Sequence, residues 1–223
     1  MKKDELEVLR RNLPVCPGIN GKGEYYNSVV LVLLTLINDE YQIVFEKRCK
    51  DIRQGGEICL PGGMYDAEQD ASLEMTALRE TREELGVAAE EIEIVGRLDT
   101  VVALMGTTVD VFVGITRVKP EEMRINPDEV ERIFTLPVSY FQQNEPEKYQ
   151  VMTKIHPSYI DVETQREVIL LPSARLGLPK RYRKSWGGFR HKVLVYKTNE
   201  GIIWGITARI IFDLVSRAQG SKG

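Results

Sequence analysis

Cysteine, histidine and tryptophan are scarce in this sequence, whose 223 residues include three Cys, two His and two Trp. Cys16, Cys49 and Cys59 form no C-x-x-C pair and are too few for a disulfide framework. They favour a reducing compartment over secretion, and we expect a cytoplasmic protein. His156 and His191 lie far apart in the sequence, and we assign a catalytic role to neither. No Ser-His-Asp or Cys-His arrangement is indicated.

Long apolar runs and an excess of one charge are also missing. The longest apolar stretch, SVVLVLLTLI at 28–37, is too short to span a bilayer and is typical of a buried strand. The N-terminal stretch MKKDELEVLRRNLP lacks the apolar region of a signal peptide. Lys and Arg number 30 against 33 Asp and Glu, a net charge of -3, so nothing indicates a nucleic-acid surface. We therefore expect neither a membrane nor a nucleic acid as a partner.

The composition is that of a globular protein, with 43 % hydrophobic and 28 % charged residues. We expect one domain over 1–223, because no linker, repeat or low-complexity tract divides the chain. Residues 141–190 are the least legible part, polar and in places basic, with one β run at 166–171. We interpret them as an insert.

The periodicity of the apolar residues predicts helices and strands in mixed order. Amphipathic helices are expected at 2–12, at about 71–85 and at 206–218. Strands are expected at 28–37, 41–48, 58–63, 91–104, 107–116, within 126–141, at 191–198 and at 201–205. This order predicts an α/β fold in which helices cover a mixed sheet.

Three glutamates in the helix expected at 71–85 repel one another. Glu80, Glu83 and Glu84 fall at i, i+3 and i+4 and share one helix face, where each like-charge pair costs about 0.2–0.5 kcal/mol. A divalent cation such as Mg²⁺ would relieve this repulsion, because it prefers oxygen ligands. The alternative is a solvated acidic face, with Arg79 and Arg82 as local counter-ions.

The glycine pair before this helix, Gly62 and Gly63, supports the metal hypothesis. Glycine lets a backbone carbonyl approach an ion or a phosphate that a side chain would keep away. A loop carbonyl together with helical carboxylates would form a metal platform for a polyanionic substrate.

The segment RETREELGV at 79–87 resembles the second half of the Nudix box, G-x5-E-x7-R-E-U-x-E-E-x-G-U. It meets that pattern at the charged and glycine positions, with Thr81 in a slot that is usually aliphatic. The first half departs, because Ala71 and Tyr65 occupy the positions of the box glutamate and glycine. With Gly63 as the box glycine, the loop is two residues longer than the pattern.

Three acidic residues are candidates for the box glutamate in this longer loop: Glu68, Asp70 and Glu74. The sequence does not choose among them.

The resemblance implies an α/β/α sandwich around a mixed sheet and hydrolysis of a nucleoside diphosphate linked to another moiety, with Mg²⁺ or Mn²⁺. The metal ligands that it implies are Glu80, Glu83, Glu84 and the carbonyl of Gly62 or Gly63. Glu80 is alternatively the group that deprotonates water, and Arg79 would pair with a carboxylate and orient it.

The stretch FEKRCKDIRQGGEICLPGG at 45–63 resembles LLTxRSxxxRxxxGxxxFPGG, the segment of the coenzyme A diphosphatase branch. Arg48 and Arg53 keep their interval and the Pro-Gly-Gly turn is kept, whereas Gly56 lies one residue closer to Arg53. The remaining departures are Val44, Phe45 and Glu46 for LLT, Cys49 for Ser and Leu60 for Phe. The resemblance covers most of 28–140 and again 191–216.

Coenzyme A carries several phosphates, so basic groups are needed beside the metal. Arg48 and Arg53 are candidates for phosphate binding, with Gly62, and ordinary salt bridges are the alternative for both arginines. The basic run PKRYRKSWGGFRHK at 179–192 is a phosphate clamp or a solvated loop. Glu129 or Glu131 is a candidate for an extra metal ligand or base.

Three functions remain open. The first is hydrolysis of coenzyme A to 3′,5′-ADP and 4′-phosphopantetheine. The second is hydrolysis of another nucleoside diphosphate derivative such as ADP-ribose, and the third is a binding module without turnover. By analogy with the family we also expect a possible homodimer, and the insert would form either the dimer contact or a lid.

Overall fold

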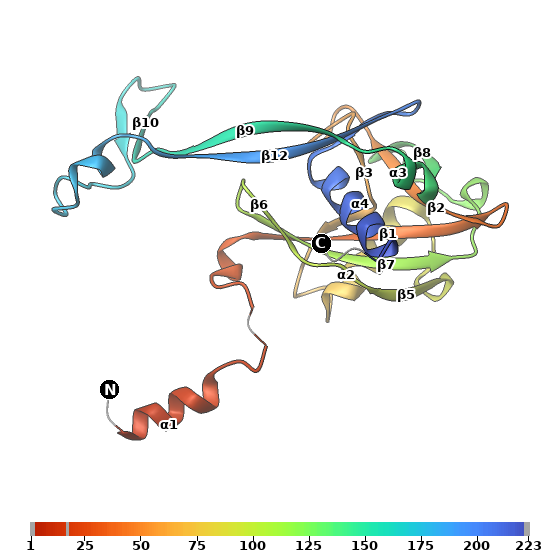
Figure 1. Cartoon of the computed structure of the whole chain (residues 1–223), viewed down its shortest axis with the longest axis horizontal. Helices are drawn as coiled ribbons and strands as arrows, with labels where there is room; N and C mark the ends of the chain where they lie inside the picture. The colour runs from red at the N-terminus through yellow and green to blue at the C-terminus, as the bar shows by residue number, and fades with distance from the viewer. Residues whose placement is uncertain (1–2, 17, 221–223) are drawn as a thin grey trace.

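Figure 1 shows the computed structural model of the chain, which describes residues 3–16 and 18–220. The helices are α1 (Lys3–Asn12), α2 (Leu73–Leu85), α3 (Val138–Gln143) and α4 (Gly205–Ala218). The strands are β1 (Tyr26–Ile37), β2 (Glu40–Arg48), β3 (Ile58–Cys59), β4 (Gly62–Met64), β5 (Ile92–Arg97), β6 (Val101–Ala103), β7 (Thr107–Thr116), β8 (Val130–Pro137), β9 (Glu147–Ile155), β10 (Ser158–Ile160), β11 (Glu167–Ile169), β12 (Trp186–Thr198) and β13 (Gly201–Trp204).

A mixed sheet forms the centre of the molecule. Its main strand order is β3-β2-β1-β7-β5, with β4 paired to β1, β6 to β7 and β8 to β2. β1 and β7 run parallel, from Tyr26↔Thr107 to Thr35↔Thr116, whereas the other pairs of this sheet are antiparallel. The mixed α/β sheet expected from the sequence is confirmed.

The side chains of β1 alternate between two cores. Val29, Leu31 and Leu33 pack in a cluster that includes Leu85 of α2, whereas Val32 packs in a second cluster with residues of α4. Successive side chains of a strand point to opposite faces, so α2 and α4 cover opposite faces of the sheet. This is the expected α/β/α sandwich, and it explains why β1 is apolar without interruption.

α2 begins two residues later than the sequence predicts and ends where expected. The hydroxyl of Ser72 accepts a hydrogen bond from the Met75 N–H at 3.2 Å and caps the first turn. Gly86 has φ 68°, and its N–H donates to the carbonyl of Arg82. This left-handed ending favours glycine and fixes the last turn of α2, which carries the acids.

α4 covers the other face of the sheet together with α3. Its buried residues are Ala208, Ile210, Ile211 and Val215. The helix expected at 206–218 is therefore confirmed, with its start one residue earlier.

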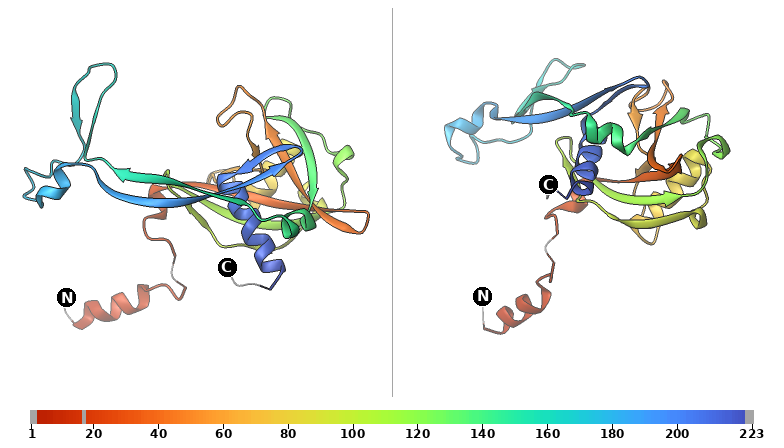
Figure 2. Two further views of the ribbon diagram at one scale, coloured as in Figure 1. Left: turned by 45° about the horizontal axis from the view of Figure 1, so that its top comes forward. Right: turned by 45° about the vertical axis from the view of Figure 1, so that its right-hand side comes forward.

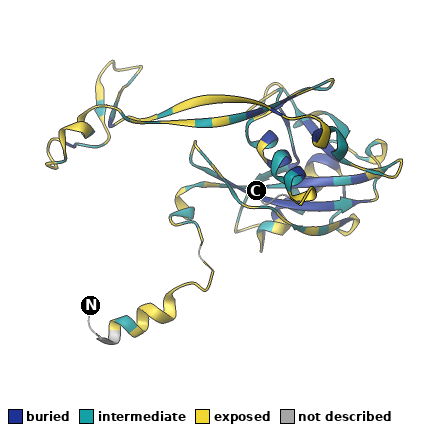
Figure 3. Ribbon diagram, viewed as in Figure 1, coloured by how far each residue is buried: buried dark blue, intermediate teal, exposed yellow. Residues whose placement is uncertain are grey.

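A two-stranded arm leaves the body of the molecule. β9 pairs antiparallel with β12, from Glu147↔Val195 to Ile155↔Trp186. Figures 1 and 2 show the arm extending away from the sheet, with β10 and β11 near its far end. Figure 3 shows that this part is mostly exposed. The arm contains most of the insert expected at 141–190, and β11 lies within the β run expected there.

α1 forms close to the range expected from the sequence, 2–12, of which residue 2 lies outside the described part. Figure 1 shows α1 apart from the sheet, and Leu9 is 43 % exposed. Within the described residues, none of the helices has both the length and the apolar character needed to cross a bilayer.

Candidate active site

The last two turns of α2 carry the acids identified from their spacing, but these acids differ in environment. The Glu84 side chain is 2 % exposed and points into the protein, Glu80 is 15 % exposed, and Glu83 lies at the rim with 46 % exposed. Arg79 forms ion pairs with Glu80 at 2.9 Å and with Glu83 at 3.0 Å. The arginine therefore offsets part of the repulsion on this face. Its ion pairs are with the other two glutamates and not with Glu84.

Asp70 is the acid that the longer loop supplies to Arg79. Its carboxylate is buried and accepts hydrogen bonds from Arg79 Nε at 3.1 Å and Nη2 at 3.0 Å. Glu68 and Glu74, the other two candidates, are exposed. The hydrogen bonds from Arg79 lower the pKa of Asp70, which is therefore an ionised anchor for the arginine.

Gly63 brings its backbone against Glu80. β4 pairs with β1 through Val29↔Gly63, which places the glycine beside the last turns of α2. A Cβ at residue 63 would lie 2.3 Å from the carboxyl carbon of Glu80, so a side chain there would displace the Glu80 carboxylate. The loop thus lies against the acids, and the expected approach of its carbonyl to an ion stays a prediction.

Gly62 interacts with Glu84 through its N–H, which donates to Oε2 at 2.8 Å. Gly62 also has φ 152°, and a Cβ would lie 2.2 Å from the Val29 carbonyl oxygen. This φ and this lack of space for a Cβ both require glycine at position 62.

Glu46 is a member of this group that the sequence reasoning missed. Its side chain is 1 % exposed, and its Oε1 accepts a hydrogen bond from the Cys59 thiol at 3.1 Å. Arg48 lies 3.9 Å from the same oxygen, and Oε2 has no hydrogen-bond partner. The available signal was the alternation of β2, because Val44 packs on the α2 face and Glu46, two residues on, shares that face.

Burial dominates the electrostatics of these carboxyls. It raises the pKa of Glu46 to about 7 and also raises the pKa of Glu80. Burial and then the charge of Glu46 raise the pKa of Glu84 to about 9. A low-polarity environment disfavours the charged form, and neighbouring carboxylates add to this effect. The group is therefore short of positive charge.

Glu129 and Glu131 separate clearly in the structure. Glu131 pairs with Lys47 at 2.8 Å on the surface. Glu129 lies in the turn before β8, and its charge raises the pKa of both Glu46 and Glu80, which places it near the acids. Its carbonyl also accepts from the Cys49 N–H at 2.9 Å. Of the two candidates, Glu129 is the one whose charge acts on these acids.

The two arginines expected to bind phosphate lie in different environments. Arg48 faces Glu46, and its Nε donates to the Arg53 carbonyl at 3.2 Å. The Arg53 residue is exposed in the loop between β2 and β3. Arg48 thus borders the acids, while the side chain of Arg53 is available to a ligand.

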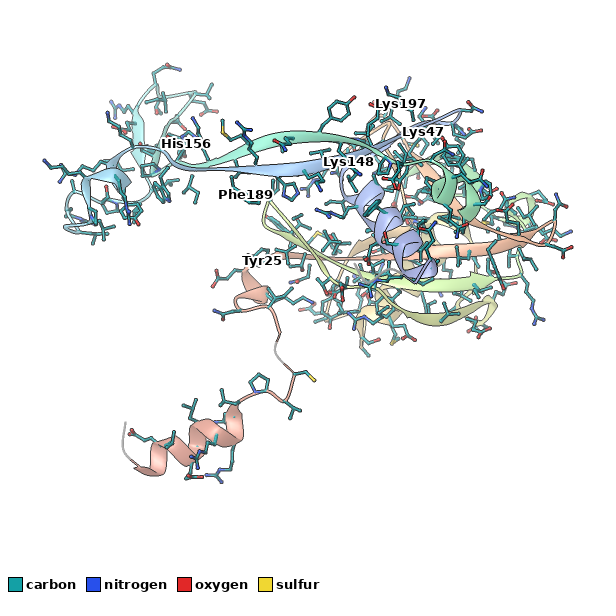
Figure 4. All side chains as sticks on the ribbon, in the orientation of Figure 1. Tyr25, Lys47, Lys148, His156, Phe189 and Lys197 are labelled. Atoms are coloured by element: carbon teal, nitrogen blue, oxygen red, sulfur yellow. The ribbon has the colours of Figure 1, made fainter. Side chains whose placement is uncertain are left out.

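The basic run at 179–192 lies away from these acids. It forms the 3-10 turn at Lys180–Arg183 and the outer half of β12, on the arm. In Figure 4, His156 and Phe189 mark this arm, apart from Lys47 on the body. A cavity of about 1020 Å³ lies between the arm, β6 and α4, and none of the acids lines it.

The donors of the site fit a hard divalent cation. They are carboxylates, which Mg²⁺ and Mn²⁺ prefer, and one buried oxygen, Glu46 Oε2, has no partner. Among the described residues, no group of three or more Asp, Glu, Cys or His side chains is arranged in this structure so that it could hold a metal ion. Instead, Arg79 forms ion pairs with Glu80 and Glu83, and the Gly62 N–H donates a hydrogen bond to Glu84.

The NUDIX domain model matches residues 27–156, which is more than half of the chain. The chain belongs to the Nudix family. The match includes β1 from its second residue, the Pro-Gly-Gly turn and α2, so the acids described above lie within the matched Nudix domain.

Two similar Nudix proteins differ in how much of this chain they match. The human mitochondrial coenzyme A diphosphatase NUDT8 is 35 % identical over 127 residues, which are 55 % of this chain and 53 % of NUDT8. A protein of Enterobacter sp. (strain 638), described as the uncharacterized Nudix hydrolase NudL, is 30 % identical over 186 residues, 82 % of this chain and 79 % of that protein. The chain thus spans about half the length of NUDT8.

A solved structure, the Nudix domain of Shewanella oneidensis NrtR with ADP ribose, is similar with 23 % identity and a TM-score of 0.44, over 64 % of this chain and 88 % of that one.

Proposed function

We propose that this Nudix protein hydrolyses the diphosphate of coenzyme A or its derivatives with Mg²⁺ or Mn²⁺, giving 3′,5′-ADP and 4′-phosphopantetheine. The observation that carries the proposal is the group of buried carboxylates against the Gly62-Gly63 turn, which is short of positive charge. The similarity to NUDT8, which is described as a coenzyme A diphosphatase, supports coenzyme A as the substrate.

Bound Mg²⁺ or Mn²⁺ supplies charge neutralisation for the diphosphate and lowers the pKa of a coordinated water. In the proposal Glu83 and Glu84 would hold the cation with the Gly63 carbonyl, while Glu80 would hold it or accept a proton from the attacking water. Arg79 fixes the orientation of the helix acids through its bond to Asp70.

Arg53 and Arg48 contact substrate phosphates in this proposal. Arg53 is exposed in the loop that leads to the Pro-Gly-Gly turn, and a guanidinium binds phosphate through paired donors. Arg48 borders Glu46 and keeps positive charge beside the acids.

Incubation of the purified chain with Mg²⁺ or Mn²⁺ and a panel of substrates tests the proposal. Coenzyme A, acyl-CoA, ADP-ribose, NADH and diadenosine polyphosphates would be compared by chromatography of the products. Glu83→Gln is the inactive variant, and Glu74→Gln, an exposed glutamate of the same helix, is the matched control. We expect coenzyme A or an acyl-CoA to give the highest kcat/KM, and only Glu83→Gln to lose turnover.

The two alternatives predict different results in the same assay. Turnover of ADP-ribose alone would exclude the coenzyme A assignment and keep the Nudix reaction. Metal-dependent binding of a panel member without any product would indicate a binding module.

We also propose that the chain forms a homodimer through the arm. Phe189 is 69 % exposed, Met152 60 % and Val151 50 %, in a two-stranded ribbon that extends from the body. An isolated ribbon of this kind is marginally stable in water, and a partner that packs on the ribbon would cover these exposed apolar side chains. The arm carries an excess of basic residues while the whole chain is acidic, which favours a second copy as the partner.

Sedimentation velocity of the full chain tests the dimer. We expect a dimer that Phe189→Ser weakens, while the exposed polar change Thr164→Ser, near the tip of the arm, leaves it intact. A monomer at all accessible concentrations would exclude the proposal. A single domain over 1–223 and a cytoplasmic location stay predictions.

A further inference from the structure

We propose that Glu46 is an additional carboxylate ligand of the metal centre, which binds a divalent cation together with Glu84. This inference rests on the proposed function, because it assigns one more residue to the same cation. Residue 46 is a glutamate where the coenzyme A diphosphatase segment has Thr, so this ligand is a property of this chain.

The position of Glu46 follows from β2. Phe45 packs in the α4 core and Val44 in the α2 core, so the alternation of the strand places Glu46 on the α2 face. β3 pairs beside it through Glu46↔Cys59, close to the Pro-Gly-Gly turn. Glu46 and the α2 acids therefore converge on the same space from two different elements.

The partners of Glu46 do not compensate a buried charge. Its Oε1 has only the Cys59 thiol, a weak donor, and a guanidinium at 3.9 Å, which is beyond hydrogen-bond distance. Its Oε2 is buried and has no donor at all. Buried polar groups are normally satisfied, and an unpartnered carboxylate oxygen strongly destabilises a fold unless a ligand completes it.

The neighbours of Glu46 identify the missing partner as a cation. The charges of Glu46, Glu80 and Glu129 act on one another, and the charge of Glu46 also acts on Glu84. The positive charge beside Glu46 comes from Arg48, whose Nε also donates a hydrogen bond to the Arg53 carbonyl. A hard divalent cation binds carboxylates of this kind, whereas an anion or an apolar ligand does not.

The alternative is that Glu46 is a protonated, purely structural side chain. A protonated carboxyl donates a hydrogen bond, and Glu46→Gln would preserve such a donor while removing the metal ligand. Glu46→Thr restores the residue of the resembling segment. The two variants therefore separate loss of a carboxylate from loss of packing.

Titration of the full-length protein with Mn²⁺ tests the inference without any turnover. Free Mn²⁺ is counted by its electron paramagnetic resonance signal in the wild type, Glu46→Gln and Glu46→Thr. Glu131→Gln on neighbouring β8 is the matched control, because Glu131 is a surface carboxylate paired with Lys47. Circular dichroism confirms that each variant is folded.

We expect both Glu46 variants to bind Mn²⁺ at least 10-fold more weakly or with one equivalent fewer, while Glu131→Gln binds as the wild type does. We also expect Mn²⁺ to raise the Tm of the wild type more than that of either Glu46 variant. Unchanged Mn²⁺ affinity and stoichiometry in Glu46→Gln would overturn the inference and leave the proposed function standing. A wild type that binds no Mn²⁺ would overturn both.

Discussion

Arg79 donates hydrogen bonds to both oxygens of Asp70, from Nε to Oδ1 at 3.1 Å and from Nη2 to Oδ2 at 3.0 Å. The same guanidinium forms ion pairs with Glu80 and Glu83. One arginine thus joins the loop before α2 to two acids of the helix. The orientation of those acids therefore depends on Asp70, which needs no contact of its own with a ligand.

Asp70→Asn should weaken both stability and turnover. It removes a charge-assisted pair from a buried position, which costs about 1.5–3 kcal/mol of unfolding free energy. Because Arg79 then loses its anchor, we expect kcat to fall about 10–100-fold, as is common for groups that orient metal ligands. Urea unfolding and product chromatography measure the two effects. Glu68→Gln, an exposed acid of the same loop, is the control, and equal behaviour of the two variants would contradict this role of Asp70.

Gly63→Ala should lower turnover sharply. The added methyl would lie 2.3 Å from the Glu80 carboxyl carbon and would displace that side chain. A displacement of about 1 Å at a catalytic group commonly costs about 100-fold in rate. The matched control is Gly96→Ala in β5, where a Cβ meets nothing within 4 Å. Steady-state kinetics of the two variants would show the difference, and a fully active Gly63→Ala protein would contradict the described approach of the loop to Glu80.

Glu84→Gln should change stability and turnover in opposite directions. Without metal, burial and the nearby charge of Glu46 make an ionised Glu84 unfavourable. The substitution removes this carboxyl, so we expect a higher Tm. With metal, it removes a proposed ligand, so we expect little turnover. Differential scanning calorimetry in a chelating buffer measures the first effect. A lower Tm together with wild-type turnover would show that Glu84 is a structural residue.

The metal-free protein should lose stability as the pH rises. The pKa of Glu46 is about 7 and that of Glu84 is about 9, and both lie above the ordinary value of 4.5. Between the ordinary value and these raised values, the native state therefore binds more protons than the unfolded state. The free energy of unfolding therefore decreases with pH in this window, and the contribution is fully present only below about pH 4.5. The groups that face these carboxyls are Arg48, Cys59, Glu80, Glu129 and the Gly62 N–H.

Chemical denaturation from pH 5 to 9 in a chelating buffer measures this dependence. We expect the slope to flatten in Glu46→Gln and Glu84→Gln, because neither amide titrates. Stability that rises over the same range in the wild type would contradict the described burial of the two acids.

The sequence predicted the parts of the site that are local. Glu80, Glu83 and Glu84 lie within two turns of one helix, whose spacing brings them together, and Gly86 marks the end of that helix. Gly63 was also identified, because a glycine pair before an acidic helix favours a close approach of the loop. These features depend on few residues and on regular geometry.

The parts that the sequence could not decide depend on contacts between distant segments. Asp70 was one of three candidates, and its pairing with Arg79 depends on how the longer loop folds. Glu46 follows Phe45 near the end of a buried strand, and its environment is set by Cys59 and α2. The insert was expected, but its shape as an arm was not, because β9 and β12 pair across about 40 residues of chain, which no local pattern indicates.

Anomalous diffraction from crystals of the wild-type protein grown with Mn²⁺ would locate the cation. We expect an anomalous peak at coordination distance, about 2.0–2.6 Å, from carboxylate oxygens of Glu84 and of at least one other acid of this group. The peak should be absent from crystals of Glu84→Gln. Ordered crystals at saturating Mn²⁺ with no peak beside the last turns of α2 would contradict the claim that these acids gather to bind a cation.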